Sequence, residues 1–130
     1  MALSSTTNRR ITWALRLLLA LAFGAAGAAK LAGAVQMIQV FDLIGIGQWF
    51  RYVTGVVEVA GAVLLLVPSM GFFGGLLLGV TMVFAVATHL LMIGGSPVPA
   101  VVLAVLSGFV AYRLRPAVAG AARSRAGVAG

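Results

Sequence analysis

Long apolar segments are the feature that most limits what this chain can fold into. Four of them follow Arg10, separated by short breaks rich in polar residues, glycine or proline. Of the 130 residues, 62% are hydrophobic and 8% are charged, and the mean hydropathy is +1.15. Helices and strands of a soluble domain keep one face polar because that face meets water, which breaks up their apolar runs. The sequence therefore predicts an integral membrane protein.

The four apolar segments predict membrane-spanning helices at about residues 11–29, 49–67, 71–93 and 98–112. A helix rises ~1.5 Å per residue, so that about 20 residues cross the ~30 Å of bilayer hydrocarbon. The last segment is short for this task, and we expect it to tilt or to thin the bilayer locally.

The piece between the first two spans, residues 31–47, has a different pattern. It is apolar but carries Gln36, Gln39 and Asp42, and Gly45 follows them. This pattern predicts a short amphipathic helix in the membrane interface, followed by a turn. The predicted fold class is all-α, a four-transmembrane-helix bundle with a short interfacial helix between helices 1 and 2.

The charge distribution predicts how the bundle is oriented. The formal net charge is +7, and six arginines flank the first and last spans: Arg9, Arg10, Arg113, Arg115, Arg123 and Arg125. We read these as membrane flanks and expect no nucleic-acid partner. Basic residues favour the inner side, so we expect both termini to be cytoplasmic in a bacterial cytoplasmic membrane. The domain limits would be a cytoplasmic segment at 1–10, the membrane domain at 11–115 and a disordered basic tail at 116–130.

Small residues four apart predict where helices pack closely. They are Ala20, Gly24 and Ala28 in the first span, and Gly71, Gly75 and Gly79 in the third. The second set could serve either a contact within the chain or a homo-oligomer.

Ionisable residues at membrane depth are costly, and they are candidates for function by default. Glu58 is the foremost, because it lies about nine residues, or ~13 Å, along its helix from the interfacial Trp49. Three basic residues belong to the same half of the predicted bundle: Lys30, Arg51 and His89. The sequence thus predicts a polar intramembrane site formed by Glu58, Lys30, His89 and Arg51.

Each of these residues also has a structural interpretation. Glu58 and Lys30 could be a buried ion pair that fixes helix register. Arg51 could be an interfacial anchor or a partner of Asp42, and His89 could make an interhelical hydrogen bond. The chain has no cysteine and one histidine, a poor ligand set, so we expect no metal site.

The motifs of the first two spans resemble those of the DoxX and DoxX-like family. They comprise Gly27-Ala-Ala-Lys30, Trp49, Tyr52, Gly55-Val-Val-Glu58-Val-Ala-Gly61-Ala62 and, in the third span, His89. The resemblance covers roughly residues 11–115 and implies a four-helix membrane fold. It singles out Lys30, Glu58 and His89. The family is named for a subunit of an archaeal thiosulfate to quinone oxidoreductase, and most members lack an established activity.

Three functions remain open at this point. The first is an accessory subunit of a membrane oxidoreductase assembly, whose Lys30, Glu58 and His89 line a site for a quinone or another lipophilic small molecule. The second is a small proton-coupled transporter. The third is a membrane scaffold or assembly factor with no chemistry of its own. A quinone is the one cofactor candidate, and the sequence does not decide whether the chain is an enzyme.

Overall fold

The computed structural model describes residues 4–116, and this part of the chain is helical with no strand. The elements in chain order are α1 (Ser5–Ala32), α2 (Val35–Ile44), α3 (Trp49–Leu66), the 3-10 turn η1 (Pro68–Met70), α4 (Gly71–Thr88), the π-helical turn η2 (His89–Ile93) and α5 (Val98–Arg113). The prediction of an all-α fold is confirmed. Of the expected tail, residues 117–130 lie outside the described part.

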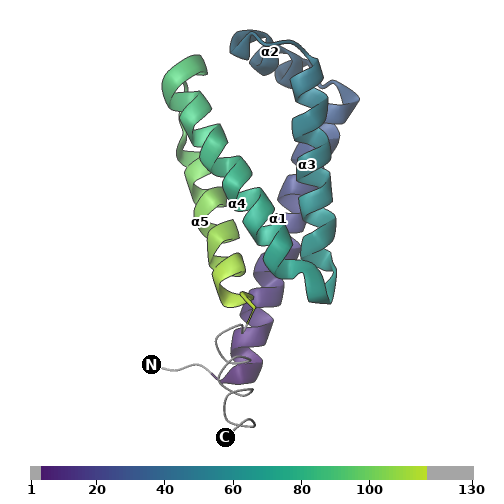
Figure 1. The fold of residues 1–130 in the computed structure, drawn as a ribbon, viewed down its shortest axis with the longest axis vertical. Coiled ribbons are helices and arrows are strands. Elements are labelled where there is room, and N and C mark those ends of the chain that lie inside the picture. Colours follow the sequence, from purple (N-terminus) through teal and green to yellow (C-terminus); the bar gives the residue numbers. More distant parts are fainter. Residues whose placement is uncertain (1–3, 117–130) are drawn as a thin grey trace, which may run out of the picture.

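Within residues 4–116, three helical segments are long and apolar enough to cross a membrane: Ser5–Ala32, Trp49–Leu66 and Pro68–Ile93. α5 has 16 residues and α2 has 10, so both are shorter apolar helices. The helix predicted between the first two spans is present as α2, and Gly45 ends it with a φ of 84°. Figure 1 shows α2 at the end of the bundle opposite the start of α1.

The first helix begins earlier than the sequence predicted, at Ser5 rather than Ile11. The Ser4 hydroxyl accepts a hydrogen bond from the Thr7 backbone N–H at 3.1 Å, which is the geometry of an N-terminal cap. The cap satisfies one of the free amides of the first turn and lets the polar residues before Ile11 join the helix.

The third-span glycines pack within the chain. A Cβ on Gly75 would lie 2.9 Å from both the Ser107 carbonyl oxygen and the Ala111 nitrogen of α5, and one on Gly79 would lie 3.6 Å from the Gly108 nitrogen. The predicted packing seam on this helix is therefore confirmed as the contact between α4 and α5.

Large apolar side chains cover the outside of the bundle. Leu91 is 82% exposed and Phe84 is 69% exposed, and many Leu and Val side chains on the other helices are also exposed. A contiguous apolar exterior of this kind is typical of a surface in contact with lipid. The buried core is a smaller set: Leu19, Ala20, Phe23, Ala62, Leu65, Leu78, Met82, Ala100 and Val110.

Candidate functional site

The site begins with the close approach of α1 and α3, which run antiparallel (Figure 1). A Cβ on Gly27 would lie 2.8 Å from the Gly55 carbonyl oxygen and 2.7 Å from the Val59 side chain. A Cβ on Gly55 would lie 3.1 Å from the Gly27 carbonyl oxygen. Both positions need glycine because the two backbones are in direct contact there.

Lys30 and Glu58 follow these glycines by three residues each, and they form an ion pair. Side chains in a helix tilt toward its N-terminus, so that in antiparallel helices these two side chains lean toward each other. Lys30 Nζ lies 3.0 Å from Glu58 Oε2, and the two side chains are 14% and 3% exposed. The Gly-x-x-Lys and Gly-x-x-Glu motifs thus bring one cation and one carboxylate together at the helix contact.

Arg51 lies near this pair but binds elsewhere. Its Nη1 donates to the backbone carbonyl of Lys30, and its Nε donates to Gln48 Oε1 at 2.7 Å. The carbonyls of a last helical turn lack intrahelical partners, and a cation beside them also favours the helix dipole. Arg51 therefore holds the end of α1 and forms no ion pair or hydrogen bond with Glu58.

Gln48 connects Arg51 to Asp42, a role that sequence reasoning missed. Its Nε2 donates to Asp42 Oδ1 at 2.8 Å and to the Ile38 carbonyl oxygen at 3.0 Å. Arg51 and Asp42 are thus joined through an amide rather than in a direct pair. The signal that could have indicated this is a single amide side chain in the short, otherwise apolar link between α2 and α3.

The ion pair lies in the wall of a cavity of about 750 Å³. All five α-helices contribute to its lining, and α3 and α4 diverge toward the end where α2 lies (Figure 1). Most lining side chains are apolar, among them Phe23, Met37, Phe41, Phe50, Met82 and Leu103. The cavity is an apolar space with a buried ion pair at its surface.

The threonines that line the cavity offer no free donor hydrogen. Thr54, Thr81 and Thr88 each donate their hydroxyl to a carbonyl one turn earlier in their own helix, at 2.9, 2.8 and 2.8 Å. The lining side chains that can form hydrogen bonds with a ligand are therefore those of the ion pair and of His89, which also lines the cavity.

His89 is half-buried at the start of the π-helical turn, where its ring is fixed by a backbone contact. Its Nδ1 lies 2.9 Å from the Gly94 carbonyl oxygen. A carbonyl oxygen only accepts hydrogen bonds, so Nδ1 donates, and in the neutral ring Nε2 keeps its lone pair. The structure thus places Lys30, Glu58 and His89 in the lining of one cavity. Arg51 is not part of that lining.

Residues 4–116 contain no group of three or more His, Asp or Glu side chains placed to bind a metal ion. Asp42 and Glu58 are bound to Gln48 and Lys30 instead.

Comparison with known proteins places these residues in a family. The model of the DoxX-like family matches residues 14–112. The chain belongs to the DoxX-like family. No curated protein and no solved structure matches it. The glycines at 27 and 55, the ion pair and His89 all fall inside the matched range, and the predicted membership of the family is confirmed. Family membership and the apolar helices together indicate a membrane protein.

Proposed function

We propose that this DoxX-like protein is an accessory subunit of a membrane oxidoreductase assembly, and that its cavity binds a quinone or a similar lipophilic molecule. The observation that carries the proposal is the placement of Lys30, Glu58 and His89 around one apolar cavity. Small-molecule sites are mostly apolar, with a few polar groups that orient the ligand, and typically measure about 300–1,000 Å³. The cavity of about 750 Å³ lies in this range.

The polar groups suit a ligand with carbonyl or hydroxyl oxygens. Lys30 Nζ has three hydrogens, and the ion pair with Glu58 uses one of them. His89 Nε2 can accept a hydrogen bond from a hydroxyl when the ring is neutral, and it can donate to a carbonyl when the ring is protonated. A quinone supplies two-electron chemistry coupled to protons. His89 and Glu58 would exchange protons with its oxygens.

The ligands that the chain can offer to a redox centre support the accessory role. The sequence has no cysteine, so it lacks the thiolate ligands of an iron–sulfur cluster, and its single histidine does not suffice for a bis-histidine haem. The electrons for a bound quinone would come from a partner subunit.

We also propose the full four-span topology, with α5 as the fourth span and residues 11–115 as the membrane domain. α5 packs along α4 through the Gly75 and Gly79 seam, and its 16 residues give a length of ~24 Å, which would span a locally thinned bilayer. The start of α1 and the end of α5 lie at the same end of the bundle (Figure 1). The arginines at that end favour the cytoplasmic side of a bacterial cell membrane.

The test of the cavity uses a variant that fills it. Ala26 lines the cavity, whereas the neighbouring Ala25 is exposed on the outside of α1. Binding of decyl-ubiquinone and of a short-chain menaquinone is measured by titration calorimetry on the protein in nanodiscs. We expect Ala26→Phe to abolish binding and Ala25→Phe to leave it unchanged.

Two results would overturn the proposal. One is no binding of either quinone by the wild-type chain, which would leave the scaffold interpretation. The other is equal loss of quinone binding with Ala25→Phe and Ala26→Phe, which would show that the cavity is not the site.

Co-purification of a redox subunit from native membranes tests the accessory role separately. Proton-driven uptake into proteoliposomes without such a partner would favour the transporter instead.

A further inference from the structure

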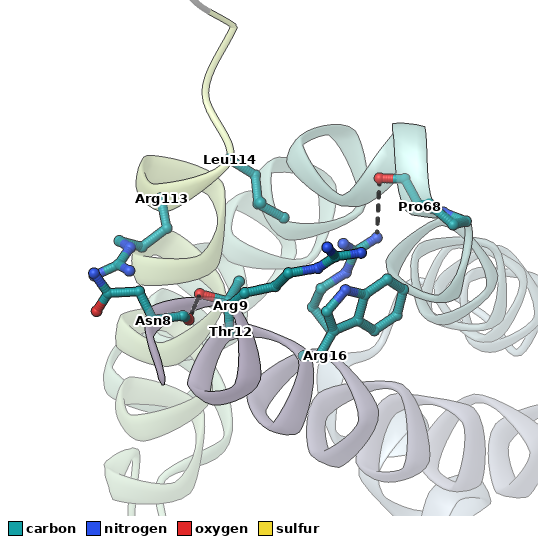
Figure 2. A pocket seen from close by; sticks show the side chains of 8 residues that line it. Asn8, Arg9, Thr12, Arg16, Pro68, Arg113 and Leu114 are labelled. Atoms are coloured by element: carbon teal, nitrogen blue, oxygen red, sulfur yellow. Dashed lines mark hydrogen bonds between the residues drawn. The ribbon is translucent and has the colours of Figure 1, made fainter. Parts of the chain in front are cut away.

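A second hollow lies at the opposite end of the bundle from the cavity. Its volume is about 380 Å³, and it is bounded by the first turns of α1, by Pro68 in η1 and by the end of α5 (Figure 2). Three arginines from the two ends of the described chain line it: Arg9 and Arg16 from α1, and Arg113 from α5. The described part of the chain places no acidic side chain in its lining.

Arg16 lines this hollow, and its side chain is held in one position by its contacts. It is 3% exposed, its Nε donates to the Leu65 carbonyl oxygen at 2.7 Å and its Nη2 donates to the Val67 carbonyl oxygen at 2.7 Å. Its Cζ lies 3.9 Å from the centroid of the Trp13 ring. Gly71 leaves room for it, since a Cβ there would lie 2.7 Å from Arg16 Cζ. The guanidinium is therefore held in place before any ligand arrives.

Arg9 and Arg113 are less constrained. Figure 2 shows the Arg9 side chain reaching across the hollow toward Arg16, with Arg113 on the other side. Within residues 4–116, Arg9 and Arg113 donate no hydrogen bond to a carboxylate, and Arg113 has a contact with the Phe109 ring at 5.6 Å. These guanidinium groups are free to turn toward a ligand.

The chain's own acidic side chains do not neutralise this cluster. The sequence has two, Asp42 and Glu58, and at the other end of the bundle they are bound by Gln48 and Lys30. Like charges around one hollow repel each other, and an anion placed among them removes the repulsion. Arginine forks also match the oxygens of a phosphate group.

We propose that this hollow binds the phosphate of an anionic phospholipid headgroup. The hollow lies at the end of the bundle where α1 begins and α5 ends, and Trp13, which lines it, is an aromatic of the kind that sits at headgroup depth. Leu114 adds an apolar wall, which suits a ligand whose phosphate continues into an acyl chain. Free phosphate has the same negative charge, but it has no acyl chain to contact Leu114.

The test compares arginines that line the hollow with arginines that do not. Arg9→Gln/Arg113→Gln removes two lining charges, and the control Arg10→Gln/Arg115→Gln removes two charges from the same end outside the lining. Native mass spectrometry in detergent measures retention of dioleoyl phosphatidylglycerol against dioleoyl phosphatidylcholine. Since loss of charge-assisted hydrogen bonds costs about tenfold or more, we expect about tenfold weaker phosphatidylglycerol retention in the first variant. The control should stay near wild type.

Three outcomes would overturn the proposal. Equal retention of the two lipids by the wild-type chain would show that headgroup charge is not recognised. Equal loss in both variants would show diffuse attraction to a basic surface rather than a site. Displacement of phosphatidylglycerol by millimolar inorganic phosphate would show that free phosphate, not a lipid, is the ligand.

Discussion

Arg51 of α3 donates a hydrogen bond to the backbone carbonyl of Lys30 at the end of α1. A residue that the sequence suggested as a neighbour of Glu58 therefore holds in place the helix end that carries the partner of Glu58. The same pair of helices has the reciprocal arrangement at its other end, where Arg16 of α1 donates to the carbonyls of Leu65 and Val67 at the end of α3. Each antiparallel helix thus supplies an arginine to the carbonyl end of the other, where a cation is favourable.

Breaking the ion pair on one side should destabilise the bundle strongly. Glu58→Gln leaves Lys30 without its counter-charge, and Lys30→Met leaves the carboxylate unpaired in an apolar wall. We expect each single variant to lower the free energy of unfolding by about 3–5 kcal/mol. Unfolding in mixed micelles of increasing dodecyl sulfate content measures this.

The double variant Lys30→Met/Glu58→Gln is the matched control, because it removes both charges. Its loss should be clearly smaller than the sum of the two single losses. Additive losses would mean that the two side chains do not interact in the folded protein.

Gly27→Ala should separate α1 from α3, because the added methyl group would meet the Gly55 carbonyl oxygen and the Val59 side chain at 2.8 and 2.7 Å. We expect a loss of about 1–3 kcal/mol in the free energy of unfolding. Gly24→Ala is the control on the same helix, since its Cβ would meet only the Ala62 Cβ, at 4.0 Å. Thermal unfolding followed by circular dichroism should show Gly24→Ala at or above wild type. A similar fall in both variants would contradict the close contact at Gly27.

Gln48→Leu should weaken the junction between α2 and α3, because it removes the amide that joins Asp42 to Arg51. The expected cost is about 1–3 kcal/mol, since a charged donor and a charged acceptor each lose a partner. Amide hydrogen exchange should show faster exchange in α2 and at the end of α1. Gln39→Leu is the comparison, as Gln39 is exposed on α2; unchanged exchange in Gln48→Leu would show that the amide link is dispensable.

Arg16→Lys keeps the charge but loses the geometry, because an ammonium cannot donate in parallel from Nε and Nη2 to the carbonyls of Leu65 and Val67. We expect a loss of about 1–3 kcal/mol in the free energy of unfolding, measured by the same micelle titration. Arg10→Lys should have no effect, as Arg10 is exposed in the first turns of α1. Full stability of Arg16→Lys would mean that its charge alone matters.

Hydropathy and spacing in the sequence were enough to predict the helical segments, the helix at Val35–Ile44 and the packing seam of α4. They also singled out Glu58, because a carboxylate inside an apolar run is costly whatever surrounds it. The start of α1 was placed too late, because the Ser4 cap outweighs the polarity of the residues that follow it.

Tertiary structure decided which cation pairs with Glu58. The sequence placed Lys30, Arg51 and His89 in the same half of the predicted bundle as Glu58, and the contact of Gly27 with Gly55 brings Lys30 to the carboxylate. The packing of α1 against α3 likewise decided that Arg16 and Arg51 donate hydrogen bonds to backbone carbonyls at the end of the neighbouring helix. A helix pattern records which residues share a face, whereas the partner of each side chain depends on how closely and in which direction two helices cross.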